Sequence, residues 1–190
     1  MRLSRLPVYS LLTPLLGLVT MANAPATHGA DLPLETIEMP EGFKIDLYAE
    51  VPDARAIKLS ERGVLFVSSR EEPGSVRAVL DTDNDFKADE VVTIDTGLRM
   101  PNGIVLRDGD LYVAEVSRIW RYPNIEANLN DPPEPELIYD DLPTDAHHGW
   151  KFMALGPDDR LYFNIGAPCN ICNKEDDDPR YATISSIQPD

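Results

Sequence analysis

Cysteine, positive charge and helical periodicity are all scarce in this chain of 190 residues. Only two cysteines occur, Cys169 and Cys172, so disulfides cannot be what holds the fold together. Lysine and arginine number 17 against 33 acidic residues, which gives a formal net charge of -16. Such a surface repels phosphate backbones, so we do not expect a nucleic acid as a partner. Beyond the amino-terminal region no long apolar stripe recurs at three and four residues, which favours an all-β fold.

The first 30 residues contain the longest apolar run. Arg2 and Arg5 form a basic start, the leucine-rich run Leu6 to Val19 follows, and small residues come next. This order is typical of a secretory signal peptide, here with cleavage between about residues 22 and 30. The run is too short and too interrupted by proline for a comfortable membrane span, although an uncleaved anchor stays an alternative. We therefore predict a signal peptide over 1–30, a periplasmic or secreted protein and no stable membrane span.

The rest of the chain repeats one pattern three times. In each copy a short apolar strand is followed by an acidic or glycine turn and by a second strand with an aromatic residue near its centre. The aromatic residues are Phe66, Tyr112 and Tyr162, which lie 46 and 50 residues apart. A repeat of roughly 40–50 residues with turn-bounded strands is typical of a β-propeller blade. The repeat predicts that residues 31–190 form about three blades.

A propeller blade has four antiparallel strands, counted outward from the central channel. Turn residues between apolar stretches predict the strands. They cover 55–59, 64–68, 75–80 and 90–95 in blade one, 103–106, 110–114, 118–122 and 136–139 in blade two, and 151–155, 161–165 and 183–187 in blade three. An earlier strand over 43–50 has the place of a ring-closing strand. Because three partial blades cannot close a ring, we expect residues 31–190 to be the amino-terminal part of a longer propeller, with a complete small β-protein as the alternative.

Antiparallel geometry sorts the loops of each blade to two ends. The loops that enter an inner strand and those that leave a second strand share one end, which we call the mouth, and the other end is the far end. The mouth is predicted to carry 98–102, 115–117, 145–149 and the insertion 166–181, and the far end to carry the loop that starts at Asp81. His147 and His148 therefore lie at the mouth. An imidazole with a pKa of about 6.5 can accept a proton from a substrate hydroxyl there.

Two stretches carry a resemblance to a known family: His147-His148-Gly149, and the run from Leu155 to Gly166. They resemble the glucose/sorbosone dehydrogenases that use pyrroloquinoline quinone. Shorter stretches at 96–98, 101–103 and 108–114 are similar to the sorbosone-type branch. The resemblance spans about residues 41 to 190. It implies a six-bladed β-propeller whose channel mouth holds the quinone and a calcium ion.

The resemblance also implies a reaction, the oxidation of a sugar or sugar aldehyde by hydride transfer to the quinone, with calcium as Lewis acid. The family's catalytic base falls on His148, and His147, Arg99 and Asn102 are candidate substrate contacts. His147 and Ala167 stand where glucose-specific members carry acidic residues, so the substrate need not be glucose. Most cofactor-binding positions of the family lie in later blades, so this chain alone is expected to be inactive. The electron acceptor stays unknown.

Two other functions remain open at this point. A calcium-dependent lactonase-type propeller hydrolase has the same architecture, but it needs carboxylates and asparagine around a channel metal, and the mouth shows histidines instead. A propeller that binds a ligand without catalysis is the third possibility. Arg70 and Glu115 are also predicted at the mouth, where arginine and glutamate are common surface residues.

An acidic loop at the far end has the alternating carboxylates that calcium favours, namely Asp81, Asp83, Asp85 and Asp89. Phe86 stands where an EF-hand loop requires glycine, so the loop is not an EF-hand. A structural calcium site and an Asx-rich turn without metal are both open.

The two cysteines form a CxxC pair inside the insertion. Asn173 follows instead of the histidine of a haem-attachment motif, and no thioredoxin-like context surrounds the pair. A structural disulfide between Cys169 and Cys172 is the favoured interpretation. A zinc site that combines the cysteines with the two histidines is the alternative.

Overall fold

A computed structural model describes residues 32–189 of the chain. The chain divides into two compact units, residues 1–37 and residues 38–190. The described part of the first unit contains a short 3-10 helix, η1 (Leu34–Thr36). The predicted signal peptide over 1–30 lies outside the described residues. Within residues 32–189 no helix is long and apolar enough to cross a membrane.

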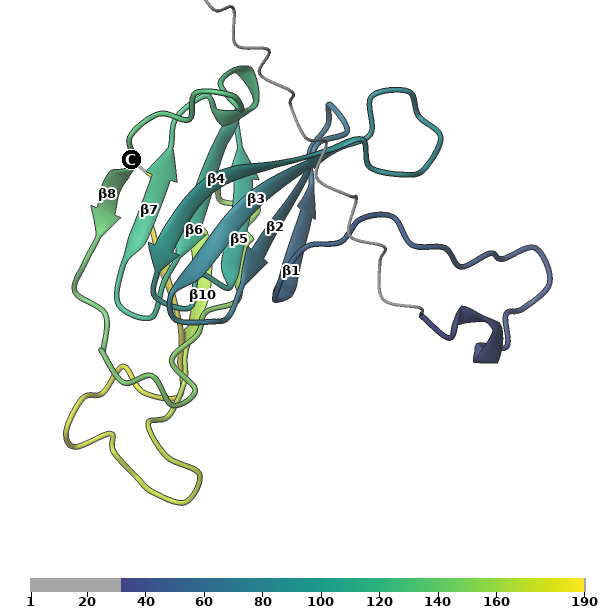
Figure 1. Ribbon diagram of the computed structural model, residues 1–190. Coiled ribbons are helices and arrows are strands. Elements are labelled where there is room, and N and C mark those ends of the chain that lie inside the picture. The colour runs from purple at the N-terminus through teal and green to yellow at the C-terminus, as the bar shows by residue number, and fades with distance from the viewer. Residues whose placement is uncertain (1–31, 190) are drawn as a thin grey trace, which may run out of the picture. The chain divides into compact units, whose positions relative to one another are not determined.

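The second unit is built from three antiparallel sheets, one for each predicted blade (Figure 1). Blade one contains, in order, β1 (Ala54–Leu59), β2 (Leu65–Ser69), β3 (Gly74–Leu80) and β4 (Glu90–Leu98). Blade two contains β5 (Gly103–Arg107), β6 (Asp110–Ala114), β7 (Ile119–Tyr122) and β8 (Glu136–Tyr139), with a 3-10 helix η2 (Ile125–Ala127). Blade three contains β9 (Met153–Leu155), β10 (Leu161–Ile165) and β11 (Thr183–Ile187). The all-β prediction with about three blades is confirmed.

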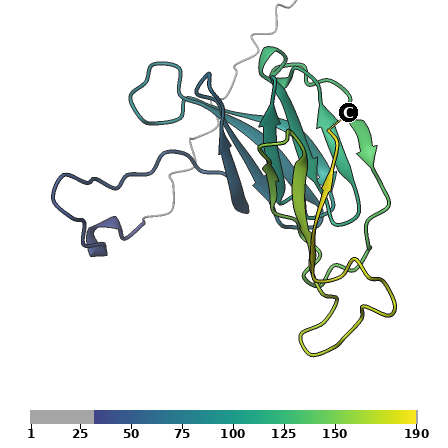
Figure 2. The same ribbon diagram turned by 180° about the vertical axis from the view of Figure 1, so that it is seen from behind.

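The blades stack through their inner strands. β1 lies beside β5, and β5 lies beside β9. In each sheet the later strands follow outward in sequence order. Figures 1 and 2 show the three sheets side by side. This radial order, with the inner strands next to one another, is that of propeller blades around a channel.

An apolar core fills the space between blades one and two. Phe66 and Val76 of blade one pack with Leu111, Val113 and other apolar residues of blade two. All four side chains are fully buried. Because side chains alternate between the faces of a strand, Leu111 and Val113 face blade one while the residue between them faces the other way.

A second core fills the space between blades two and three. Tyr112 of blade two packs with Met153, Leu161 and Phe163 of blade three. The same alternation therefore gives blade two one apolar face for each neighbour. Both cores lie between sheets, so the stability of each blade depends on the next one.

The repeated aromatic residue shows this dependence directly. Phe66 and Tyr112 are 0% and 1% exposed because each faces the following blade. Tyr162 has the same position in blade three but is only half-buried, and its hydroxyl donates to Asp158 at 2.9 Å. Ile184, on the strand paired with β10, is 78% exposed. Within residues 32–189 nothing covers this outer face of blade three as blade three covers Tyr112.

The outer face of blade one is open only along its inner strand. Ile57 pairs with Val67, Leu59 pairs with Leu65, and the two β1 side chains are 66% and 62% exposed. Val67 and Val79, on the same face of β2 and β3, are 4% and 0% exposed. The two inner interfaces are closed, while the outer face of blade three and the β1 margin of blade one are open.

The predicted strand over 43–50 is wrong. This segment has no strand pairing in the structure, and one backbone hydrogen bond, from the Ala88 N–H to the Tyr48 oxygen at 2.8 Å, joins it to a distant residue. Phe43 within it is 68% exposed. The alternating pattern is present, but a strand forms only against a partner that continues the hydrogen-bond ladder.

β9 is shorter than predicted and begins at Met153 instead of residue 151. The Phe152 N–H donates to the side-chain oxygen of Asn164 at 2.6 Å. This bond replaces the ladder partner that a longer β9 would use. Residues 150–152 therefore lie outside the strand, at the mouth end of β9.

Candidate active site

The loops meet at two ends, as antiparallel geometry requires. At the mouth, the Arg99 side chain donates to the Thr144 oxygen at 2.9 Å and the Val116 N–H donates to the Arg99 oxygen at 3.2 Å. The loop between β3 and β4, residues 81–89, lies at the opposite end from the insertion 166–181 in both views (Figures 1 and 2). The histidine loop and the acidic loop are therefore separate features.

His148 is held against the insertion that follows β10. Its Nδ1 lies 3.0 Å from the carbonyl oxygen of Ala167. A carbonyl oxygen can only accept a hydrogen bond, so Nδ1 is the donor, and in the neutral ring Nε2 is the nitrogen with the lone pair. The half-buried ring is thus fixed in a tautomer that presents one basic nitrogen, as a general base requires.

The backbone around His148 is fixed by two close approaches. His148 itself has a φ of 51°, in the left-handed region. Gly166 packs against the His148 carbonyl, and Gly149 packs against the Asp145 carbonyl, so closely that a Cβ at either glycine would collide with the oxygen. Only glycine fits at these two positions. They hold the histidine loop tightly against the end of β10.

His147 stacks beside His148, with ring centroids 4.0 Å apart and a tilt of 45°. Its Nε2 lies 3.2 Å from the side-chain oxygen of Asn170. Asn170 stands between Cys169 and Cys172, which the structure joins in a disulfide. Because both thiols are in the disulfide, no thiolate is left for the zinc alternative.

Two further contacts hold the insertion on the histidine loop. The Tyr181 hydroxyl donates to the Asp145 carboxylate at 2.5 Å, and this hydrogen bond is the main cause that raises the pKa of Tyr181 to about 12. Arg180 donates to the Asp141 carbonyl and pairs with Asp178 at 2.7 Å. The loop and the insertion therefore form one connected wall of the mouth.

A hollow of about 530 Å³ opens between the inner strands beside this wall. Its lining comprises Arg55, Ala56, Ile57, Asn102, Trp150, Phe152 and Asn164. The Trp150 ring meets His148 edge-on, with centroids 5.9 Å apart, and the Arg70 guanidinium lies 4.6 Å over the Trp150 ring. The hollow therefore combines aromatic surface with a few polar groups, and one of its residues, Trp150, contacts the His148 ring.

Two asparagines fix the segment that lines the hollow. Asn164 accepts from the Phe152 N–H and donates to the Trp150 oxygen at 3.3 Å. Asn102 is buried, and its amide donates to the Lys151 oxygen at 2.6 Å. Asn102, predicted as a substrate contact, therefore uses one hydrogen bond from its amide to position the backbone of Lys151. Sequence reasoning missed Asn164, because its side chain acts on a segment more than ten residues away.

Lys151 is buried between blades, only 1% exposed, and its ammonium donates to the Gly149 oxygen. Among residues 32–189 no carboxylate pairs with it, and burial lowers its pKa to about 8. Lysine is almost never fully buried without a counter-charge, because the charged form loses its hydration. In the sequence it stands between two aromatic residues, and nothing there distinguishes it from a solvent-facing strand residue.

Arg99 and Glu115 are held by other protein groups. Arg99 pairs through Nε with Glu72 at 3.3 Å. Glu115 is 6% exposed and accepts from the Arg99 N–H and from the Trp120 indole at 2.7 Å. Of the predicted substrate contacts, Arg99 and Asn102 join loops to one another. His147, on the histidine loop at the mouth, is exposed.

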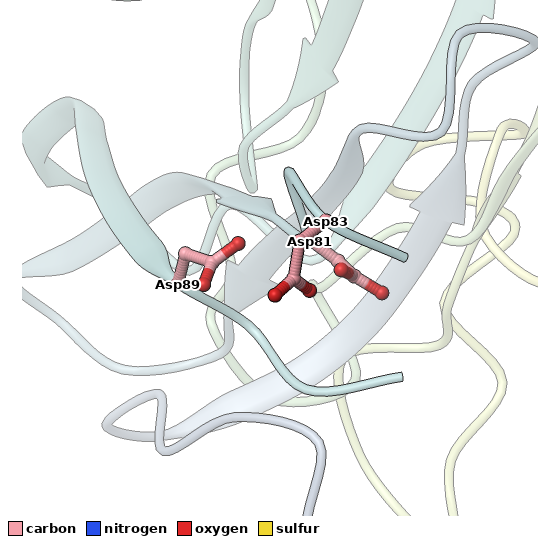
Figure 3. A group of neighbouring side chains, drawn as sticks. All are labelled: Asp81, Asp83 and Asp89. Atoms are coloured by element: carbon pink, nitrogen blue, oxygen red, sulfur yellow. The ribbon is translucent and has the colours of Figure 1, made fainter. Parts of the chain in front are cut away.

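At the far end the acidic loop brings three of its four carboxylates together. Figure 3 shows Asp81, Asp83 and Asp89, which each offer one carboxylate oxygen such that the three oxygens lie within 4.8 Å of one another. Asp85 is outside this group, and its carboxylate accepts from the Lys87 N–H at 2.8 Å.

The same carboxylates also satisfy the backbone of their own loop. Asp81 accepts from the Asn84 and Phe86 N–H groups, at 2.7 and 3.0 Å. Asp89 accepts from the side chain and the N–H of Thr82, and these bonds lower its pKa. The geometry agrees with an Asx-rich turn and with a calcium site, and in either case it is remote from His148.

Sequence comparison finds one distant relative and no family. No family model matches the chain. An uncharacterized protein of Borreliella burgdorferi is 26% identical over 157 residues, an alignment that covers 76% of this chain and 39% of the relative.

Structural comparison finds similarity to solved structures of three proteins, two of which are named as dehydrogenases. The chain is similar to a Trichoderma reesei protein of carbohydrate-active enzyme family AA12, in its iodide structure, with a TM-score of 0.64 and 17% identity over 78% of this chain and 39% of that one. It is similar to the PQQ domain of pyranose dehydrogenase from Coprinopsis cinerea in its holo form, with a TM-score of 0.52 and 15% identity over 63% of this chain and 29% of that one. It is also similar to the PQQ-bound aldose sugar dehydrogenase of Streptomyces coelicolor, with a TM-score of 0.51 and 18% identity over 75% of this chain and 46% of that one.

These likenesses establish the fold. The chain spans less than half the length of each of these relatives. At identities of 15–18% the shared architecture, not a shared set of site residues, is what the structures have in common. The chain therefore has the fold of part of a β-propeller of the kind found in sugar dehydrogenase domains that bind PQQ.

Proposed function

We propose that this chain is the amino-terminal part of an exported, quinone-dependent dehydrogenase that oxidises a sugar or a sugar aldehyde. The observation that carries the proposal is the orientation of His148, whose Nδ1 is bonded to Ala167 and whose ring meets Trp150, a residue that lines the hollow, edge-on. The fold shared with PQQ-binding sugar dehydrogenase domains supports it.

His148 acts as the base. Its Nε2 takes the proton of a substrate hydroxyl while the hydrogen on the same carbon leaves with its electron pair, so that the C–O bond becomes C=O. The hydrogen bond from Nδ1 to the Ala167 oxygen stabilises the imidazolium that forms. A bound quinone supplies the acceptor for the hydride and its two electrons.

The lining of the hollow fits a quinone better than it fits calcium. Trp150 and Phe152 offer flat apolar faces, and Arg55 and Arg70 offer donors for carboxylates. The lining contains no carboxylate, and the side-chain oxygen of Asn164 already accepts from the Phe152 N–H, so the side-chain oxygen of Asn102 would be a lone ligand. We therefore assign no calcium at the mouth to these residues and derive no step through it.

A longer propeller and export complete the proposal. The open apolar face of blade three and the exposed β1 margin of blade one support further blades, since each inner interface shows how such surface is buried. The disulfide supports a periplasmic or secreted location, in agreement with the predicted signal peptide. A structural calcium ion bound by Asp81, Asp83 and Asp89 at the far end is a separate proposal, because calcium prefers carboxylate oxygens.

The test is reconstitution of the full-length protein with quinone and calcium, followed by reduction of a redox dye with a panel of aldoses and sugar aldehydes. We expect sugar-dependent dye reduction that requires the quinone. Hydrolysis of lactones with no dye reduction would instead support the hydrolase alternative. If the protein shows neither activity, a propeller that binds a ligand without catalysis is the remaining function.

A further inference from the structure

Side chains hold the three consecutive carbonyls that follow His148. β9 begins only at Met153, so these carbonyls precede its ladder. Each oxygen accepts one side-chain hydrogen bond: Gly149 from Lys151, Trp150 from Asn164 and Lys151 from Asn102. Backbone groups withdrawn from water need such partners, so these three donors decide the path of the chain between the histidine loop and the strand.

The donor to Gly149 differs from the other two because it is charged. Within residues 32–189 only two charged side chains are buried, Lys151 and Glu115. Glu115 accepts hydrogen bonds from the Arg99 N–H and the Trp120 indole, whereas the Lys151 ammonium is bonded to a single neutral carbonyl. A buried charge without a counter-charge is costly. Its combination of burial and missing counter-charge distinguishes Lys151 from the other cations of the described chain.

A neutral donor would satisfy a carbonyl at lower cost, as the amides of Asn164 and Asn102 do. The pKa of Lys151, lowered by burial to about 8, still lies above neutral pH, so the group is an ammonium there. Hydrogen bonds from a charged donor are shorter and stronger than those from a neutral one. The Gly149 carbonyl is therefore held more firmly than its two neighbours.

The firmly held carbonyl belongs to a turn with an unfavourable backbone conformation. His148 has a φ of 51°, which a residue with a Cβ adopts only when its surroundings enforce it. Both backbone groups of Gly149 are anchored, since its N–H donates to the Ala146 oxygen at 3.0 Å and its oxygen accepts from Lys151. Lys151 thus supplies one of the restraints on the turn that contains His148.

We propose that Lys151 is a positioning residue whose buried ammonium fixes the Gly149 carbonyl and thereby keeps the His148 ring bonded to Ala167 and edge-on to Trp150. Lys151 is not among the residues that line the hollow, so it acts through the histidine loop and not on a ligand. The effect on turnover rests on the proposed function. The effect on the geometry of His148 does not.

A packing role is the alternative explanation for Lys151. Its side chain is buried between blades two and three, close to the core that contains Met153. If packing were its only role, replacement would lower stability and leave His148 in place in the molecules that stay folded. If the ammonium positions the loop, an apolar side chain of similar volume should leave a protein that is at least as stable but has a displaced His148.

The experiment compares Lys151→Met and the neutral, shorter Lys151→Gln with the parent in the full-length protein, without added cofactor. Histidine and glycine are labelled with ¹⁵N, and NMR follows the His148 Nδ1–H and the Gly149 amide and their exchange with water. The matched control is Tyr122→Phe, which removes another buried side-chain hydrogen bond, the one to Asp95 in the core between blades one and two. Thermal melts at pH 7 show whether each variant is folded.

We expect the His148 Nδ1–H and the Gly149 amide to exchange at least about tenfold faster in Lys151→Met, with a Tm no lower than that of the parent. In the reconstituted enzyme kcat should fall by about 10- to 100-fold with KM unchanged, because a small displacement of a catalytic group has an effect of this size. Tyr122→Phe should lower Tm and keep both the NMR signals and kcat.

Unchanged His148 and Gly149 signals in a folded Lys151→Met would overturn the inference, and so would equal changes in Tyr122→Phe. If Lys151→Met does not fold, Lys151→Gln decides in the same way. Failure here is distinguishable from failure of the proposed function, because the NMR measurement needs no cofactor and no turnover. Displaced signals in a protein that oxidises no sugar would keep the positioning role and refute the dehydrogenase, whereas unchanged signals and kcat in an active Lys151→Met enzyme would do the reverse.

Discussion

Arg107 at the far end and two of the cations at the mouth face different surroundings, although Arg99 and Arg180 at the mouth are paired with carboxylates. At the far end Arg107 lies near Asp108 at 3.7 Å and is bonded to Asp159 of the next blade at 2.9 Å. At the mouth, Arg70 and Lys151 have no carboxylate partner among residues 32–189. Paired charges at the far end join one blade to another. Unpaired cations at the mouth cost stability unless a ligand uses them, and local rules are most often broken at functional sites.

The largest expected effect is that of the base at the mouth. In the reconstituted full-length enzyme, His148→Gln should lower kcat by about 10²- to 10⁴-fold, because a positioned general base contributes that much. The far-end variant Asp159→Asn should leave kcat unchanged. Steady-state dye reduction measures both, and full turnover in His148→Gln would refute the assigned role.

Lys151 should give the mouth a pH-dependent stability. Its folded pKa of about 8 is below the usual 10.5, so the unfolded chain binds the proton more tightly and stability rises with pH between these values. From pH 7 to pH 9.5 the free energy of unfolding should rise by about 2 kcal/mol. Urea denaturation at both pH values measures it.

Lys151→Met is the matched control, since it fills a similar volume without charge. It should lack this rise with pH and be more stable than the parent at pH 7, because the buried charge is gone. An equal rise with pH in both proteins would show that another group is responsible.

Calcium should act at the far end only. If Asp81, Asp83 and Asp89 hold calcium, a concentration ten times Kd should stabilise the chain by about 1.4 kcal/mol, and EDTA should reverse the gain. Asp83→Asn should abolish the response, while Asp85→Asn, outside the cluster, should largely keep it. A melting temperature unchanged by calcium would favour the Asx-rich turn.

The smallest effect is expected from the exposed pair at the far end. The hydrogen bond from Arg107 lowers the pKa of Asp159, so its contribution to stability is present near neutral pH and is lost as the pH falls below about 4. Arg107→Gln should lower Tm slightly at pH 7 and not at pH 3. A difference that persists at pH 3 would mean that packing, not charge, is responsible.

The strands of the three blades were predictable from sequence because their alternation and turn residues are local. The exception at 43–50 carries the same alternation, but Phe43 has no partner sheet within residues 32–189, and pairing is a tertiary property. The short β9 is another case, since a side chain from β10 ends its ladder.

The repeat and the loop geometry were enough to bring His148 to the mouth and the acidic loop to the far end, because strand direction follows from the order of turns. Which nitrogen of His148 donates a hydrogen bond depends on the Ala167 oxygen, 19 residues away. Asn102 holds the backbone in place by a hydrogen bond to the Lys151 oxygen, 49 residues away. Protonation, burial and pairing are set by groups that only folding brings together, so they were decided by the tertiary structure alone.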